Sequence, residues 1–509
     1  MQTAVRQLLL GVGEDPEREG LMDTPRRVAK AWLDMTRGYR QECKSAFGTA
    51  LFHEPIVSEG GSGLVIVRDI TFAALSEASL LPFHGRCHIA YVPADGVVLG
   101  LSKVARVTKC LAARLQTQQQ FADRLVAAVA GETRAAGVAA VVQAVHLDAG
   151  PAPAACLSSA AAGCFAEPSC GHLAEFLALL RLGGRAAPPA SSFAGAVAEA
   201  AQQQQQAQAQ QTQQAQQTQQ QPGEGPSSSM VAAASTLLLS VGEDPARKGL
   251  KGGAARYASW LLGATAGYRM QLPGSAGGSP ELAPPTPDDH SPDPSDASSD
   301  DMSAELPFYL GMREAEAAAA APQAAAAAAA AAAVAEPATS SAAAAAVEGL
   351  AAGAVQQQGQ QQGGGAAGGL LTFTAHFSSQ CEHHLLPFYG RLKLAYLPAD
   401  GGSGSGGGGA HAALLAHVVQ MYSRRLQVQE RLTHQVADAA MAALGARAVL
   451  VVVESAHMCM VARGVEKHAS TTLTTAARGA WAADVAQRAA ALEALLEPSN
   501  GAALPAGAR

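Results

Sequence analysis

The stretch "SQCEHHLLPFYG", residues 379–390, has a close counterpart in "SEASLLPFHG", residues 76–85, at an offset of 305 residues. Both segments contain Leu-Leu-Pro-Phe, one variable residue and Gly. Only the later segment carries a cysteine and two histidines. A frame that returns at a fixed offset is the signature of an internal repeat. The chain therefore contains one module twice, with the reactive side chains in a single copy.

Further repeats extend the two copies. "LLLGVGEDPEREGL" (8–21) returns at an offset of 229 residues, "AYVPADG" (90–96) at 305, and "RLQTQQ" (114–119) at 311. Offsets that rise in steps indicate insertions in the second copy. These insertions amount to 76 residues before the Leu-Leu-Pro-Phe frame and 6 residues after "PADG".

Composition divides the chain into modules and spacers. Tracts rich in Gln and Ala, or in Pro, Ser and Gly, bury too little apolar surface to offset chain entropy, so we expect them to be disordered. The predicted parts are an N-terminal module without metal ligands (1–184), a Gln/Ala-rich linker (185–230), the start of the C-terminal module (231–272), a low-complexity insertion (273–369), the metal-bearing part of the C-terminal module (370–490) and a tail (491–509).

Both copies show the same order of expected elements. In the first copy these are a helix at 24–37, β-rich segments at 63–72 and 88–94, a long amphipathic helix at 102–130, and a β-run at 138–146 before a helix-prone tail. In the second copy the β-rich segments are 370–378 and 392–399, the long helix is 412–443 and the β-run is 448–457. This order predicts a duplicated α+β module.

Bulk properties narrow the function classes. A net charge of −7 and a pI near 6.1 give no basic surface for nucleic acid. The N-terminal residues lack a secretory or transit pattern, and no apolar run is long enough to span a bilayer. We therefore expect a cytoplasmic protein with neither a nucleic-acid nor a membrane partner.

The second copy carries the spacing of a metal site. Cys381 and His384 lie three positions apart, and Cys459 follows the second β-run. Two Cys and one His with an open fourth position are typical of catalytic zinc. His383 and His457 lie beside these ligands and can move protons near neutral pH. The alternative is that these residues only pack, but two Cys/His clusters at the ends of β-segments favour the metal.

Several motifs in this order resemble the GTP cyclohydrolase I family. They are "CEHHLLPF", "AYLPAD", "RLQVQERLT", "HMCMVARGV" and "STTLTT" in the second copy, and "DTPRRVAKAW" and "HIAYVPADGVVLGLSK" in the first. The resemblance covers about two thirds of the chain, and the unequal tandem is similar to the plant-type form of the family.

This resemblance implies the tunnelling fold, a four-stranded antiparallel sheet with helices on one face that closes into a barrel by oligomerising. The chain would then be two tandem tunnelling-fold modules joined by disordered spacers. The implied reaction converts GTP to 7,8-dihydroneopterin triphosphate and formate, the entry step to folate-type pterins. The implied assembly is a homo-oligomer with sites at module interfaces.

The resemblance also assigns roles by position. It implies Zn²⁺ as cofactor, held by Cys381, His384 and Cys459, with His383 and His457 moving protons. The implied guanine contacts are Glu430 and Gln429. The implied triphosphate contacts are Ser102, Lys103, Arg106, Arg463 and Arg27. By default Glu430 and Arg463 would be solvated surface charges.

The copies depart from the family pattern in opposite ways. The first copy has Ser76, Ser79 and Asp148 where the second has its metal ligands. The second has lost the "GLSK" segment that carries Ser102 and Lys103 in the first. We therefore expect a composite site, in which the first copy clamps the triphosphate and the second performs the chemistry, within one chain or between chains.

Two other readings stay open at this level. One is a catalytically degenerate regulatory or pterin-binding member of the same family, which the losses in the first copy allow. The other is the related nitrile reductase on the same fold, which uses a Cys nucleophile and nicotinamide. The complete set of Cys and His residues in the second copy favours the cyclohydrolase.

Overall fold

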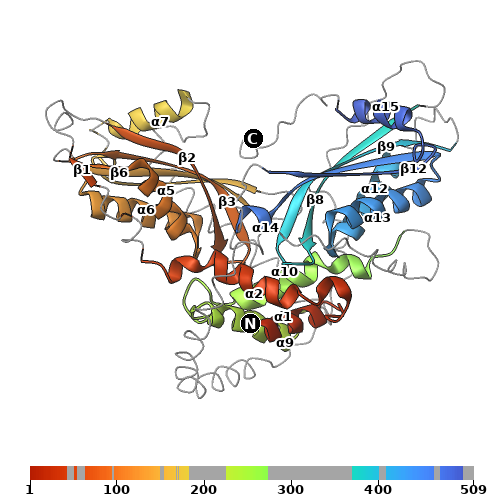
Figure 1. The fold of residues 1–509 in the computed structure, drawn as a ribbon, viewed down its shortest axis with the longest axis horizontal. Coiled ribbons are helices and arrows are strands. Elements are labelled where there is room, and N and C mark those ends of the chain that lie inside the picture. The colour runs from red at the N-terminus through yellow and green to blue at the C-terminus, as the bar shows by residue number, and fades with distance from the viewer. Residues whose placement is uncertain are drawn as a thin grey trace, which may run out of the picture. The chain divides into compact units, whose positions relative to one another are not determined.

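The computed structural model describes both modules (Figure 1). The described residues are 1–42, 47, 51–53, 64–94, 97–148, 154–167, 169, 171–182, 225–272, 369–399, 408–463 and 470–496. Most of the two predicted spacers and of the predicted tail lies outside these residues. No helix within them is both long enough and apolar enough to cross a membrane.

A five-stranded sheet forms the centre of the first module, in the order β5-β2-β3-β6-β7. Its strands are β2 (Val65–Ser76), β3 (Pro82–Val92), β5 (Leu115–Gln116), β6 (Gly137–His146) and β7 (Ala154–Gly163). The four long strands are antiparallel, and β5 adds a two-residue parallel edge to β2. A separate pair joins β1 (Leu51–His53) to β4 (Val97–Leu99).

The second module repeats this sheet in the order β10-β8-β9-β11-β12. Its strands are β8 (Leu371–Cys381), β9 (Pro387–Leu397), β10 (Leu426–Gln427), β11 (Ala448–His457) and β12 (Thr472–Gly479). Strand order and direction match those of the first sheet one for one. The predicted duplicated α+β module is confirmed.

Each predicted long helix is in fact two helices, so that expectation was wrong. The first module has α5 (Leu101–Ala112) and α6 (Gln118–Thr133), and the second has α12 (Gly408–Ser423) and α13 (Gln429–Leu444). Between α5 and α6 the chain leaves the helix to pair β5 with β2, and Thr117 then caps α6 through a capping box. This break contains neither Gly nor Pro, which is why periodicity alone missed it.

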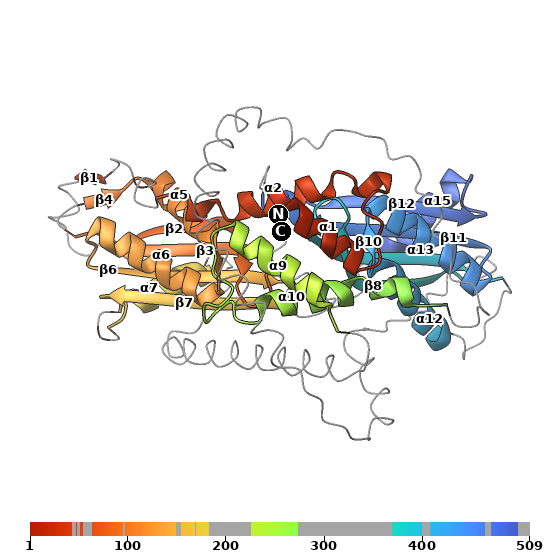
Figure 2. The same cartoon turned by 90° about the horizontal axis from the view of Figure 1, so that it is seen from below.

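Helices cover both faces of each sheet, and not one face only as expected (Figures 1 and 2). In the first module Phe83 and Tyr91 of β3 join the core made with α5 and α6. Ala90 and Val92 point the other way and pack against α7 (His172–Leu182). The second module places α15 (Val485–Leu496) in the position of α7.

Two helical arms join the modules. The first arm, residues 1–39, contains α1 (Gln2–Gly11), η1 (Glu19–Leu21), α2 (Thr24–Met35) and η2 (Arg37–Tyr39). The second arm, residues 228–269, contains α9 (Ser228–Ser240), α10 (Gly253–Ala264) and η5 (Ala266–Arg269). Both arms share one apolar cluster with Leu80, Leu81, Leu385 and Leu386. The Leu-Leu of the repeated frame is therefore buried against the arms.

Each arm extends to the other module and lies against the turn that precedes the Leu-Leu-Pro-Phe frame there. Arg18 of the first arm donates to the Glu382 carboxylate at 2.9 Å, and Thr24 Oγ1 donates to the Glu382 carbonyl at 2.8 Å. The second arm repeats this against the first module, where Arg247 pairs with Glu77 and Arg256 donates to the Ala78 carbonyl at 2.6 Å.

The end of each arm returns to its own module. Leu115 N–H donates to the Tyr39 hydroxyl at 2.9 Å, and Leu426 N–H donates to the Tyr268 hydroxyl at 3.1 Å. A Cβ at Gly38 would lie 2.2 Å from the Cys110 carbonyl oxygen, so only glycine allows this close approach.

A polar pair joins equivalent residues of the two modules. His84 Nε2 and the Tyr389 hydroxyl lie 2.7 Å apart, and both residues occupy the variable position of the repeated frame. Burial raises the pKa of Tyr389 to about 12, so the phenol stays protonated at neutral pH.

We expect Tyr389→Phe to lower the free energy of unfolding by about 1 kcal/mol, because the buried imidazole loses this partner. Urea denaturation followed by circular dichroism measures the change. Tyr39→Phe, which removes a hydroxyl at an arm end, serves as a comparison. An unchanged denaturation midpoint for Tyr389→Phe would show that the pair contributes nothing to stability.

Candidate active site

Three predicted ligands meet at one point in the second module. Cys381 ends β8, His384 lies in the following turn, and Cys459 lies in α14 (Met458–Val461) directly after β11. Their ligand atoms all lie within 4.8 Å of one another, and Cys381 Sγ is 3.9 Å from His384 Nδ1. Leu385 has a φ of 50°, which closes the turn and lets its N–H donate to the Cys381 carbonyl at 2.9 Å.

Electrostatics favour a thiolate in this cluster. The hydrogen bond with Cys459 lowers the pKa of Cys381 well below its ordinary value; burial opposes this, and His383 and His384 add to it. The pKa of His383 is raised, chiefly by its hydrogen bond with Cys381 and against the effect of burial. Negative charge therefore gathers where a cation would bind.

His457 is held in a fixed orientation beside the cluster. Its ring stacks on Phe388 at 4.6 Å, and its Nε2 lies 2.8 Å from Gln429 Oε1. The Gln429 amide nitrogen donates to the carbonyls of Val453 and Thr472, so Oε1 must be the acceptor and His457 Nε2 the donor. Burial lowers the pKa of His457, which keeps the ring neutral.

The two residues assigned to guanine differ in environment. Gln429 is buried, and both ends of its amide are engaged by protein groups. Glu430 is the next residue in the first turn of α13; it is exposed, and its charge raises the pKa of His457. Glu430 is therefore the member of the pair whose side chain faces solvent near His457.

The first arm brings charged residues to the cluster. Arg27 of α2 acts on His383, whose pKa it lowers. Arg463 is 2% exposed; its guanidinium contacts His384 Nε2 and lies 3.8 Å from the Asp34 carboxylate of α2. Side chains of both modules thus surround the three ligands within one chain.

The remaining predicted triphosphate contacts lie elsewhere. Ser102, Lys103 and Arg106 are in the first turns of α5, where Ser102 and Arg106 are exposed. Among the described residues, no hydrogen bond or ion pair connects these three to the Cys–His–Cys cluster. Within the described residues, the predicted clamp is therefore not bonded directly to the predicted metal ligands.

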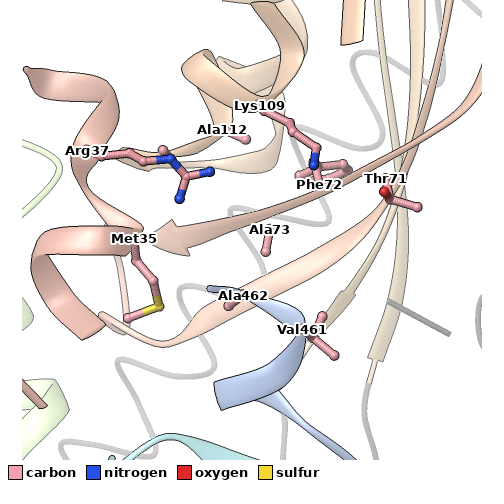
Figure 3. A pocket seen from close by; sticks show the side chains of 10 residues that line it. Met35, Arg37, Thr71, Phe72, Ala73, Lys109, Ala112, Val461 and Ala462 are labelled. Atoms are coloured by element: carbon pink, nitrogen blue, oxygen red, sulfur yellow. The ribbon is translucent and has the colours of Figure 1, made fainter. Parts of the chain in front are cut away.

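Instead, the far end of α5 reaches a hollow between the modules (Figure 3). Lys109 of α5 and Arg37 of the first arm line it from one side, and Val461 and Ala462 of the second module line it from the other. Arg463, the buried arginine of the cluster, directly follows Ala462. The hollow therefore borders the candidate site.

Comparison with known proteins identifies the family. The model of the GTP cyclohydrolase I family matches residues 1–150 and 341–496, which is more than half of the chain. The chain belongs to the GTP cyclohydrolase I family. It is 31% identical to the GTP cyclohydrolase 1 of Solanum lycopersicum, with 99% of this chain and 93% of that protein covered. It is 30% identical to that of Arabidopsis thaliana, with 97% and 89% covered.

Other relatives match over a shorter length. GTP cyclohydrolase 1 1 of Pseudomonas aeruginosa is 47% identical over 142 residues, which is 28% of this chain and 73% of that protein. The plant proteins, in contrast, are covered almost from end to end. The chain is thus an enzyme-family member consistent with the tandem two-module form of GTP cyclohydrolase I.

The first module of this family member keeps the scaffold of the site without its ligands. His146 Nε2 lies 2.8 Å from Gln118 Oε1 and stacks on Phe83 at 4.8 Å, as His457 does with its own partners. Within the described residues, Cys381, His384 and Cys459 are the one group placed to hold a metal.

Sequence reasoning missed Asp34, Glu382 and Arg431. The Glu382 carboxylate is buried and lies 2.6 Å from Arg431 as well as against Arg18 of the arm. A signal was present, because Glu77 and Glu382 are the same residue in otherwise divergent turns. A carboxylate kept in both turns indicates a shared structural task.

Proposed function

We propose that the chain converts GTP to 7,8-dihydroneopterin triphosphate and formate at a zinc ion held by Cys381, His384 and Cys459. The observation that carries this proposal is the convergence of the three ligand atoms within 4.8 Å from distant parts of the chain. The family membership supports the reaction class and its assignment to folate-type pterin biosynthesis.

The donor set fits zinc. Two sulfurs and one imidazole leave a fourth position free, as catalytic zinc sites require. The lowered pKa of Cys381 supplies the thiolate that such an ion needs. When bound, zinc would act as a Lewis acid that activates water for attack on the guanine ring.

The surrounding side chains divide the other tasks. His457 is neutral and held at Nε2 by Gln429, so its ring is preorganised to transfer a proton. His383 is half-buried beside the ligands and serves as the second proton carrier. The exposed carboxylate of Glu430 can accept from the guanine N1–H and its exocyclic amine.

The placement of the cations supports a composite site. Arg27 and Arg463 come from different modules and both lie at the cluster within one chain. In the part of the chain that the structure describes, Ser102, Lys103 and Arg106 form no hydrogen bond or ion pair with the cluster. We propose that an adjoining chain of a homo-oligomer supplies these three residues. The outer strands β7 and β12 end their sheets and offer edges for such pairing.

Complementation between two defective variants tests this arrangement. Lys103→Ala should raise the KM for GTP, and Cys459→Ser should remove turnover. If the clamp acts between chains, co-expressing both variants should restore about a quarter of wild-type activity at low GTP, since half of the chains carry zinc and half of those meet an intact clamp in a random assembly. Activity no higher than the sum of the two variants would contradict the arrangement.

Product and metal analyses test the reaction itself. Wild-type protein should release one formate per GTP and bind one zinc per chain, because the first module lacks the ligands. Pterin binding without formate release would identify a regulatory member of the family instead. Two zinc ions per chain would show that the first module also binds metal.

A further inference from the structure

We infer that Asp34 of the first arm is a positioning residue for catalysis, because it holds Arg463 over the metal cluster of the other module. This inference rests on the proposed function, since it assigns Arg463 to the phosphate groups of the substrate. The new element is that the orientation of Arg463, in the second module, depends on the carboxylate of Asp34, in the first arm.

Two successive side-chain contacts connect the first arm to the metal cluster of the second module. The Asp34 carboxylate lies 3.8 Å from one Arg463 nitrogen, and another Arg463 nitrogen contacts His384 Nε2. Burial raises the pKa of Asp34, and the charge of Arg463 opposes this more strongly than the charges of Lys30, Arg37 and Arg40 do. Because Arg463 is 2% exposed, water does little to stabilise its positive charge, and protein groups must do so instead.

Metal binding makes the carboxylate more important. His384 Nδ1 faces Cys381 Sγ, so Nδ1 is the nitrogen directed at the other ligand atoms. A neutral imidazole that ligates through Nδ1 carries its proton on Nε2. That nitrogen can then no longer accept from Arg463. The contact of the guanidinium with the Asp34 carboxylate does not depend on that nitrogen.

The duplication provides an internal control for this role. At the repeat offsets, Gly263 of the second arm corresponds to Asp34, and Ala152 of the first module corresponds to Arg463. Both partners are therefore absent at the position without metal ligands. In contrast, Arg18 and Arg247 are both kept, and each pairs with the equivalent glutamate. Contacts found on both sides hold the modules together, whereas the Asp34–Arg463 pair occurs only beside the metal ligands.

A purely structural role predicts different behaviour. The Asp34 side chain is 36% exposed, so losing its ion pair should cost little stability. If Asp34 only supported the arm, its removal would lower the melting temperature without a selective effect on phosphate binding.

The experiment compares Asp34→Asn with Asp34→Glu and with Asp438→Asn. Asp438 forms an ion pair with Arg478 in the same module, away from the cluster, and is a charge-matched control. We expect Asp34→Asn to raise the KM for GTP about tenfold, with kcat lowered less than threefold and zinc content unchanged. Asp34→Glu should recover most of the loss, and Asp438→Asn should match the wild type.

Calorimetric titration with inorganic tripolyphosphate gives a readout that does not require turnover. Asp34→Asn should weaken this binding about tenfold, and adding Asp34→Asn to Arg463→Ala should weaken it no further. Unchanged affinity, or an additive effect in the double variant, overturns the inference. If wild-type protein binds tripolyphosphate but releases no formate, the proposed function fails while the affinity comparison still decides the role of Asp34.

Discussion

Replacing Cys459 by serine is expected to remove bound zinc and GTP turnover together. The cluster has three protein ligands, and losing one thiolate leaves a donor pair too weak to retain the ion at neutral pH. We expect kcat to fall by at least about a thousandfold, as for loss of a metal that activates water. Atomic emission analysis of zinc and a formate assay on the same preparation measure both effects.

Cys156→Ser is the matched control, because this exposed cysteine lies on β7 of the first module. It should keep both zinc and activity. If Cys459→Ser retains turnover after loss of zinc, the metal assignment is wrong. If it retains zinc and loses turnover, Cys459 is not required as a ligand.

His457→Gln should lower kcat by a factor of about 100 to 10,000, the usual effect of losing a positioned proton carrier. Gln fills a similar volume and can still reach Gln429, but it cannot exchange a proton near neutral pH. Zinc content should stay at the wild-type value, which separates this variant from the loss of a ligand. Steady-state kinetics at saturating GTP measure the change.

The first module offers a control that few enzymes have. His146 has the equivalent glutamine, Gln118, as its partner and stacks on the equivalent phenylalanine, Phe83, but the first module lacks the Cys and His ligands. His146→Gln should therefore lower stability as much as His457→Gln does and leave kcat within about twofold. Equal losses of activity in both variants would assign the histidines to packing.

Much of each module could be predicted from local patterns. The apolar segment 448–457 coincides with β11, and 138–146 lies within β6, because buried central strands read as continuous apolar runs. Cys381, His384 and Cys459 stood out because their copies at 76, 79 and 148 lack metal-ligand chemistry of the same kind. A repeat within one chain thus gave the contrast that a single copy could not.

The arrangement of the arms was beyond such patterns. Amphipathic periodicity indicates that α2 has a buried face, but it does not indicate which module covers that face. The contact of Asp34 with Arg463 therefore could not be predicted from the sequence. Similarly, β7 and β12 are rich in Ala, Ser or Thr, and they gain their strand structure from pairing with β6 and β11. The position of Ser102 relative to the cluster also depends on tertiary packing.

The contact between His84 and Tyr389 has a consequence for how such chains sort their modules. Two like modules meeting in the same way would place two imidazoles or two phenols where this chain has one of each, which changes both the volume and the hydrogen bond at the contact. The observed pair therefore needs one module of each kind. A chain that carries both always has the correct partner at hand, at a local concentration that separate chains could not reach.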